Sequence, residues 1–98
     1  MKEHNERIVC QDGFTMSVQG SEYNYSTPRE DNPADGYTHV ECGYPSSKPN
    51  TAALLEYAEQ LLTDNPVYTE SVYSYVPVEV VQAELDAHGG IVKGHLPS

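Results

Sequence analysis

The 98-residue sequence has no tryptophan, a single phenylalanine and an apolar share of only 38%. This composition excludes a large aromatic core, and surface scaling gives one small domain that buries about 65% of its unfolded surface. Eight tyrosines supply the large rings that the other aromatics do not. We therefore expect a single thin domain over residues 1–98, with tyrosine in both its core and its surface.

Basic residues are scarce as well, since 5 lysines and arginines face 15 acidic residues, which gives a formal net charge of −10. They are dispersed along the chain, so the sequence predicts no clustered basic surface and no direct binding of nucleic acid. Strong acidity favours either attraction to a basic partner surface or solubility alone, and the composition leaves both interpretations open. The dispersed basic residues are Lys2, Arg7, Arg29, Lys48 and Lys93.

Long hydrophobic runs are also missing. The first ten residues carry scattered charges, so we predict neither a secretory signal nor a membrane anchor, and we expect a cytoplasmic location. The only cysteines, Cys10 and Cys42, each lie within an apolar alternating pattern. We expect them to be reduced and buried, because a free cysteine in such a pattern behaves as a small hydrophobic residue.

Motifs for metal, cofactor or catalytic chemistry are absent from the sequence. The histidines and cysteines lack the close paired spacing of a zinc site, and no glycine-rich loop has the spacing of a phosphate cradle. His39 and Cys42 lie an odd number of residues apart on one predicted strand, so their side chains point to opposite faces. His88 is expected in the last turn of a helix, where a cation complements the helix dipole. We predict no metal, no cofactor and no enzyme activity.

Alternating apolar residues predict the strands of a small antiparallel sheet. A first strand at 8–10 ends at a hairpin signal, and the next strand, 14–19, has one buried face. Residues 37–44 alternate again, with Tyr37, His39 and Glu41 on a face expected to be solvated. Residues 67–76 have the β-branched and aromatic composition of a further strand, with Tyr73 and Tyr75 on one face. Residues 20–36 are rich in turn formers and predict a surface loop, within which 21–25 either extends the preceding strand or adds an edge strand.

The first predicted helix covers residues 51–62, where leucine and alanine recur at helical spacing. Asn50 is the expected N-cap, and the sequence Asp-Asn-Pro at 64–66 is expected to end the helix. The two ends of the chain, residues 1–6 and 93–98, lack a periodic pattern and are expected to be flexible.

A second helix is predicted to begin at Pro77 and to end at the glycine pair 89–90. Its inward side is expected to carry Val78, Val81 and Leu85. The fold class predicted from these elements is α+β, with a small antiparallel sheet of three to five strands packed against two α-helices.

Tyrosines with acidic neighbours point to a binding surface. Tyrosine buries area at low entropic cost and keeps a polar tip, although several rings are expected to line the sheet instead. Carboxylates two residues apart on a strand or three apart on a helix lie about 5–7 Å apart, near the phosphate spacing of nucleic acid. Such an array fits an Arg/Lys-rich surface, and an ordinary solvated surface is the competing interpretation. The candidate partner-binding residues are Glu22, Tyr23, Glu30, Asp31, Asp35, Tyr37, His39, Glu41, Glu56, Glu59, Tyr73 and Tyr75.

Two stretches resemble small accessory proteins encoded by tailed phages and prophages. They are DGFTMSVQ at 12–19 and YVPVEVV at 75–81, the second followed by His88-Gly89-Gly90. This group includes anti-CRISPR proteins and other anti-defence inhibitors, and the matching residues are strand, turn and cap signals. The resemblance implies a host cytoplasm in which small acidic proteins block nucleases and effector complexes, and it assigns no site residue.

The function expected from the sequence is that of a non-catalytic, anti-CRISPR-like inhibitor that binds a basic surface of a host nucleic-acid-handling defence complex. Two alternatives stay open. One is a phage structural or assembly module that forms a homodimer through a sheet edge or a tyrosine face. The other is a protein that sequesters a small ligand, for which stacking tyrosines are suitable but the scarcity of basic residues is adverse.

Overall fold

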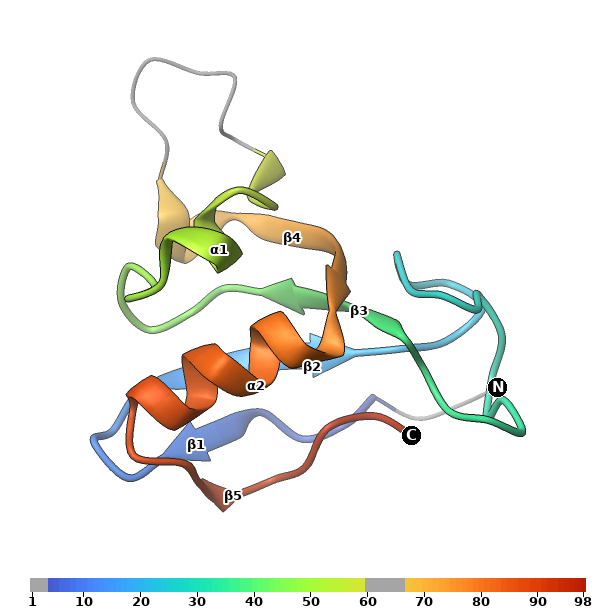
Figure 1. Cartoon of the computed structure of the whole chain (residues 1–98), viewed down its shortest axis with the longest axis horizontal. Helices are drawn as coiled ribbons and strands as arrows, with labels where there is room; N and C mark the ends of the chain where they lie inside the picture. The colour runs from blue at the N-terminus through green and yellow to red at the C-terminus, as the bar shows by residue number, and fades with distance from the viewer. Residues whose placement is uncertain (1–3, 60–66) are drawn as a thin grey trace.

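The computed structural model describes residues 4–59 and 67–98. Its centre is a five-stranded antiparallel sheet with the order β4-β3-β2-β1-β5, and α2 crosses one face of this sheet (Figure 1). The predicted α+β class with a small antiparallel sheet and two helices is confirmed. The elements are β1 (Ile8–Cys10), β2 (Thr15–Gln19), β3 (His39–Gly43), α1 (Ala52–Leu55), the 3-10 helix η2 (Tyr68–Glu70), β4 (Val72–Pro77), α2 (Val78–Ala87) and β5 (Ile91–Lys93).

The first two strands form the hairpin that the alternating pattern predicts. Ile8 pairs with Met16, and neither side chain has any solvent exposure. Within the turn, the Phe14 amide donates a hydrogen bond to Oδ1 of Asp12 at 2.9 Å. Gly13 has a φ of 93°, a conformation that a residue with a Cβ rarely adopts, and this explains the glycine at that position.

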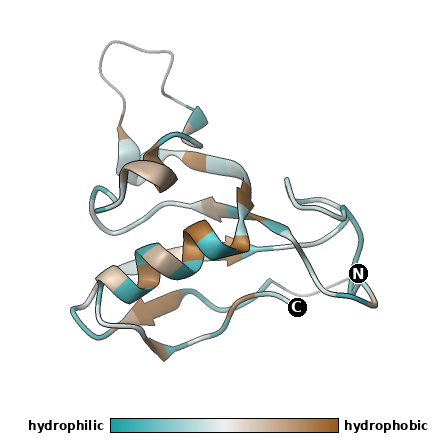
Figure 2. Cartoon of the chain, viewed as in Figure 1, coloured by the Kyte–Doolittle hydropathy of each residue, from teal (hydrophilic) through white to brown (hydrophobic). Residues whose placement is uncertain are grey.

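The core lies where the sheet packs against the helices. Figure 2 shows hydrophobic stretches on the strands and on α2, whereas the loop that joins β2 to β3 is mostly hydrophilic. Both cysteines are free and buried, as predicted, and burial raises the pKa of each thiol. The core residues are Ile8, Cys10, Phe14, Met16, Val18, Tyr37, Val40, Cys42, Leu54, Ala58, Tyr73, Val76, Val81 and Leu85.

Helix α1 is shorter than predicted and has a different cap. Its N-cap is Thr51, not Asn50, and the helix extends over 4 residues. The chain then turns, and Ala58 forms an antiparallel bridge with Tyr73 on the outer edge of β4. Pairing with that open edge competes with extension of a short helix, which is only marginally favourable by itself. Residues 56–59 are therefore not part of an α-helix, and the last predicted helical residues, 60–62, and the stop at 64–66 lie outside the described residues.

Strand β4 is shorter than predicted and contains a bulge. Val76 pairs with Val40 and Tyr73 pairs with Cys42, so β4 has one residue more than β3 between the two pairs. The additional residue breaks the alternation. Tyr73 and Val76 are both fully buried, whereas Tyr75 points outward with 41% of its surface exposed. The prediction that Tyr73 and Tyr75 share one face is therefore wrong.

Helix α2 follows the predicted pattern closely. Pro77 occupies the N-cap position, and Val81 and Leu85 are fully buried in the core, with Val78 packed against it. The glycine pair 89–90 has φ values of 89° and 88°, which confirms the predicted left-handed end of the helix.

The two ends of the chain make more contacts than predicted. Ile91–Lys93 form β5, which pairs with β1, and Leu96 packs against the core. Near the other end, the Gln19 side chain exchanges two hydrogen bonds with the backbone of Asn5, at 2.8 and 2.9 Å. Flexibility of 4–6 and 93–98 stays a prediction that hydrogen exchange would measure, and residues 1–3 lie outside the described residues.

The loop between β2 and β3 forms a lobe at one end of the sheet (Figure 1). Thr27 within it makes a single bridge to His39, and the edge strand considered for 21–25 does not form. Among the described residues, no helix is long and apolar enough to cross a membrane.

Candidate functional site

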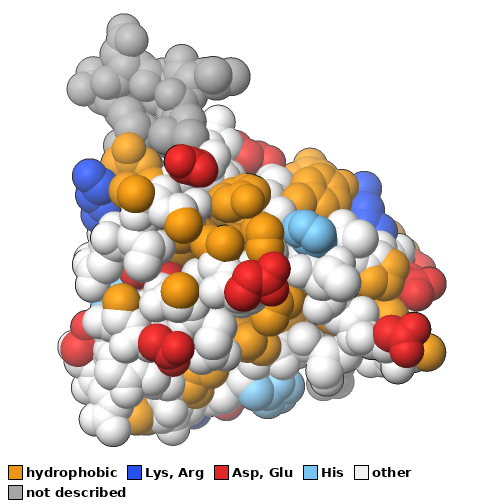
Figure 3. Space-filling model, in the orientation of Figure 1, with side chains coloured by type: hydrophobic (Ala, Val, Ile, Leu, Met, Phe, Trp, Pro, Cys, Tyr) orange, Lys and Arg blue, Asp and Glu red, His pale blue; other side chains and the backbone are white. Residues whose placement is uncertain are grey.

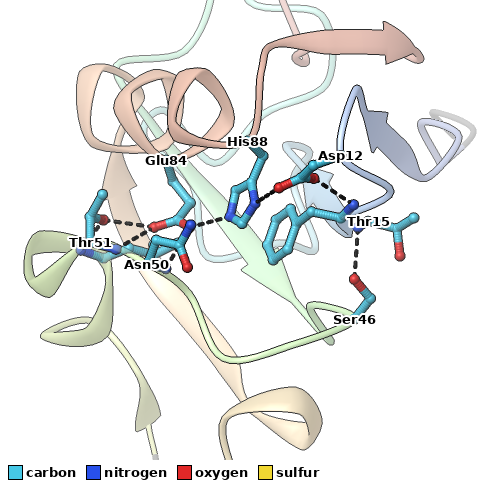
Figure 4. A network of polar contacts seen from close by, with 9 residues as sticks. Asp12, Thr15, Ser46, Asn50, Thr51, Glu84 and His88 are labelled. Carbon is cyan, nitrogen blue, oxygen red and sulfur yellow. Dashed lines mark hydrogen bonds and ion pairs between the residues drawn. The ribbon is translucent and has the colours of Figure 1, made fainter.

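Glu84 is a buried carboxylate on the inward side of α2, with no solvent exposure. The backbone amides of Asn50 and Thr51 donate to its two oxygens at 2.7 and 2.9 Å, and the Thr51 hydroxyl donates at 2.8 Å. These donors belong to the start of α1, where backbone amides have no partner within the helix. Glu84 of α2 therefore satisfies the two backbone amides that directly precede α1 (Figure 4).

His88 lies one helical turn after Glu84 and joins it to the β1–β2 turn. Its Nε2 is 2.7 Å from a Glu84 oxygen, and its Nδ1 is 2.7 Å from Oδ2 of Asp12. The Phe14 ring stacks on the imidazole, with centroids 3.8 Å apart and an interplanar angle of 6°. We call this arrangement the Asp12–His88–Glu84 chain (Figure 4).

Both carboxylates of the Asp12–His88–Glu84 chain, those of Asp12 and Glu84, are kept ionised by their hydrogen bonds. The Phe14 amide and then His88 lower the pKa of Asp12 through hydrogen bonds. Burial acts to raise the pKa of Glu84, but the hydrogen bonds from Asn50, Thr51 and His88 outweigh it, and that pKa is lowered. An ionised carboxylate only accepts hydrogen bonds, so a ring nitrogen of His88 that bonds to one donates. Because two carboxylates face a single imidazole, the three groups together carry a net negative charge.

The Asp12–His88–Glu84 chain leaves His88 unsuited to act as a base or a ligand. Both ring nitrogens are occupied, and the side chain is almost fully buried. Across residues 4–59 and 67–98, no group of three or more histidine, cysteine or acidic side chains is placed to hold a metal ion. The Asp12–His88–Glu84 chain joins three distant segments. Only Asp12 of the three residues is substantially open to solvent, with half of its side chain exposed.

A hollow of about 330 Å³ lies next to Asp12. It is bounded by the β1–β2 turn, the segment that follows β3 and the segment that precedes α1. Ser46 is fixed at its rim, because its Oγ accepts a hydrogen bond from the Thr15 amide at 2.9 Å (Figure 4). The lining residues are Asp12, Gly13, Phe14, Ser46, Ser47, Asn50 and His88.

A second feature, at the other end of β3, is an exposed aromatic pair. Tyr25 and Tyr75 have ring centroids 5.8 Å apart at an angle of 40°, and the Tyr75 amide donates to the Tyr25 carbonyl at 3.1 Å. The guanidinium of Arg29 lies over the Tyr25 ring at 5.5 Å. We call these three residues the Tyr25–Tyr75 surface. Its rings are displayed because the bulge in β4 turns Tyr75 outward.

Glu41 of β3 fixes the backbone of the Tyr25–Tyr75 surface through hydrogen bonds. Its carboxylate accepts hydrogen bonds from the Tyr25 amide at 2.9 Å and from the Asn24 side chain at 3.2 Å. Glu41 is half-buried, so its predicted place in an open acidic array is only partly correct. It positions the loop that carries the aromatic pair.

Other predicted acids lie in the loop lobe. The amide of Glu22 donates to Oδ1 of Asp31 at 3.0 Å, and the carboxylate of Glu22 raises the pKa of the exposed Tyr23 by hydrogen bonding and repulsion. Glu30 and Asp35 line a separate hollow of about 300 Å³. The structure thus gathers these predicted residues in one lobe, next to the Tyr25–Tyr75 surface.

Two predicted tyrosines belong to the core and not to an open surface. Tyr73 is fully buried, donates its hydroxyl to the Tyr68 carbonyl at 2.9 Å, and has its pKa raised by burial. Tyr37 precedes β3, is buried, and donates its hydroxyl to the Glu30 carbonyl at 2.8 Å. The expectation that Tyr37 shares a solvated face with His39 and Glu41 is wrong, because its ring packs over Gly20.

The remaining predicted residues lie apart from the loop lobe or at its border. Glu56 and Glu59 are exposed after α1, and Glu59 accepts a 2.6 Å hydrogen bond from the Ser74 hydroxyl. His39 is half-buried at the start of β3, with Nδ1 2.9 Å from Oγ1 of Thr38. Figure 3 shows acidic side chains spread over the face that carries α2, with lysine and arginine only at its margins.

The sequence interpretation missed both groups of contacts. Glu84 and His88 stand at the i, i+4 spacing that brings side chains together on a helix, so their pairing had a visible signal. Their link to Asp12 had none, because 76 positions separate it from His88. Tyr25 and Arg29 were not among the candidates, since the bulge that brings Tyr75 beside them has no local signature.

The comparisons with known proteins add no further assignment. This chain matches no protein-family model, no curated protein and no solved structure.

Proposed function

We propose that this chain is a non-catalytic binding protein that docks its Tyr25–Tyr75 surface, with the acids of the neighbouring loop, onto a basic surface of a protein partner. In its narrower form, the proposal is an anti-CRISPR-like inhibitor that acts in the host cytoplasm on a nucleic-acid-handling defence complex. The phage-type resemblance of 12–19 and 75–81 supports this narrower form, and the geometry supports the broader one.

The observation that carries the proposal is the outward turn of Tyr75. A tyrosine at a φ of 51° costs about 1 kcal/mol relative to ordinary backbone. The bulge lets Tyr73 and Val76 both face the core and leaves Tyr75 with 41% of its surface exposed, so the Tyr75 ring is displayed beside Tyr25. Strained residues and bulges concentrate where a side chain is aimed for function. Two paired, exposed tyrosines are typical of the anchors of protein interfaces.

The charge around Tyr25 and Tyr75 favours a basic partner. Residues 20–38 contain Arg29 as their only lysine or arginine, against four acids, Glu22, Glu30, Asp31 and Asp35. Arg29 already lies over the Tyr25 ring, which demonstrates that this ring accepts a guanidinium. An arginine-rich surface would meet both the ring faces and the carboxylates, and the net charge of −10 would speed its approach.

The test is affinity capture from a bacterial lysate at about 0.05 M and about 0.5 M salt, with mass spectrometry of the bound proteins. We expect a nucleic-acid-handling protein that binds at low salt, is released at high salt, and is displaced by added DNA or RNA. Displacement matters because it shows that the chain and nucleic acid compete for one basic surface. Capture that is unchanged by salt and by nucleic acid would exclude the charge-based mechanism.

A further inference from the structure

The hollow beside Asp12 is a concave feature of the surface, separate from the Tyr25–Tyr75 surface. It lies at the end of the sheet where the β1–β2 turn is found, whereas the loop lobe lies at the opposite end (Figure 1). Its volume of about 330 Å³ is within the range of small-molecule sites. Binding at this hollow would therefore not depend on the function proposed for the Tyr25–Tyr75 surface.

The Asp12 carboxylate has capacity for a further partner. The Phe14 amide occupies one position on Oδ1 at 2.9 Å, and His88 occupies one on Oδ2 at 2.7 Å. A carboxylate offers about four acceptor positions, so about two remain, one on each oxygen. A planar guanidinium donates two parallel hydrogen bonds to such a pair, and an ammonium donates to either oxygen.

The charge of the lining selects a cation. The Asp12–His88–Glu84 chain is net negative, because two carboxylates face a single imidazole, and both ring nitrogens of His88 are engaged by those carboxylates. Lysine and arginine are missing from the lining, so an anion would find no countercharge there. Ser47 and Asn50 add neutral polar groups that can accept hydrogen bonds from a cation.

Asp12 is also held in place before any ligand arrives. Two hydrogen bonds fix its carboxylate, and the stacked rings of Phe14 and His88 form a rigid wall behind it. Glu84 in turn fixes His88 from within the core. A fixed carboxylate loses little conformational entropy on binding, which is the advantage of a preformed site.

We propose that the hollow lined by Asp12, Ser46, Ser47 and Asn50 binds an organic cation through a guanidinium or primary ammonium group, with Asp12 as its countercharge. The chemistry is that of an arginine or lysine side chain or of a free amine of similar size. Glu84 and His88 position Asp12, and His88, although it lines the hollow, has both ring nitrogens engaged by carboxylates.

The experiment is a titration of the 15N-labelled chain with methylguanidinium and with butylammonium, followed through backbone amide shifts in about 0.15 M salt. We expect saturable shifts at Gly13, Phe14 and Ser47, and none at Tyr25. Tetramethylammonium, which has the charge but no N–H donor, is expected to bind at least about fivefold more weakly than methylguanidinium and butylammonium.

Variants separate this site from general attraction to an acidic protein. Asp12→Asn is expected to abolish the saturable shifts, whereas Glu79→Gln, which removes one exposed charge from α2, should leave them unchanged. Ser47→Lys, which leaves the Asp12–His88–Glu84 chain intact, should also abolish them, because its own ammonium competes. Equal losses in Asp12→Asn and Glu79→Gln, or equal binding of tetramethylammonium, would overturn the proposal.

A last comparison identifies the source of the cation. A glycine pentapeptide with a central arginine is titrated beside free arginine amide. Peptide binding tighter by about fivefold or more indicates an arginine on a protein surface, and equal or tighter binding of the free compound indicates a small molecule. Saturable binding of neither compound would overturn the proposal.

Discussion

The fully buried carboxylate of Glu84 lies 2.7 Å from Nε2 of His88, one helical turn later, and the opposite ring nitrogen lies 2.7 Å from Asp12. This relationship joins the end of α2 to the start of α1 and to the first hairpin. A buried charge is costly unless it is paired and hydrogen-bonded, so the three groups depend on one another.

Glu84→Gln is therefore expected to destabilise the protein by about 2–4 kcal/mol, since it removes the buried charge and replaces one acceptor oxygen with an NH2 group that faces other donors. Glu79→Gln, on the exposed side of the same helix, should cost less than about 1 kcal/mol. Urea unfolding of both variants measures the difference. Similar losses in the two variants would show that the buried contacts contribute nothing specific.

The stability should depend on pH in the acid range through Asp12 and Glu84. Their pKa values are lowered in the folded state from 3.8 and 4.5, so their contribution is complete above those values and is lost as the pH falls below them. Urea unfolding from pH 7 to pH 3 should show a steeper fall for the native chain than for Glu84→Gln. Identical profiles would mean that Glu84 has no lowered pKa.

The left-handed conformation of Tyr75 can be tested with two variants that both lack the ring. Tyr75→Gly should be more stable than Tyr75→Ala by about 1 kcal/mol, because only glycine adopts a φ of 51° without strain. Thermal or urea unfolding compares the two variants directly. An alanine variant of equal or greater stability would show that residue 75 does not adopt the left-handed conformation.

The different environments of the two tyrosines of β4 lead to a further prediction. Tyr73→Phe removes the hydroxyl that donates to the Tyr68 carbonyl inside the core, and should cost about 1 kcal/mol. Tyr75→Phe removes an exposed hydroxyl and should change stability by less than about 0.5 kcal/mol. Similar costs for the two variants would favour the strict alternation that places both tyrosines on one face.

Local patterns predicted those parts of the fold that depend on neighbouring residues. The first hairpin follows from the turn at Gly13 and the alternation of Phe14, Met16 and Val18, and the end of α2 follows from two glycines. Each of these signals lies within a few residues of the structure it determines.

The remaining features depend on contacts between distant segments. Leucine spacing alone favours a long first helix, but the open edge of β4 draws Ala58 into a bridge with Tyr73. The bulge at Tyr75 arises from the register between β3 and β4, which no pattern within either strand reveals. For the same reason, the prediction from sequence included Tyr73 among the partner-binding residues and left out Tyr25.

The central claim, that the Tyr25–Tyr75 surface binds a basic partner, is tested most directly by the affinity of the captured partner for two variants. Tyr25→Ala combined with Tyr75→Gly removes both rings. The control, Tyr44→Gly, removes a tyrosine beyond the other end of β3 that is 54% exposed and has the same φ of 51° as Tyr75. Calorimetry should show binding weakened by about tenfold or more for the double variant and unchanged for Tyr44→Gly. Equal affinity of the double variant and the native chain would contradict the claim.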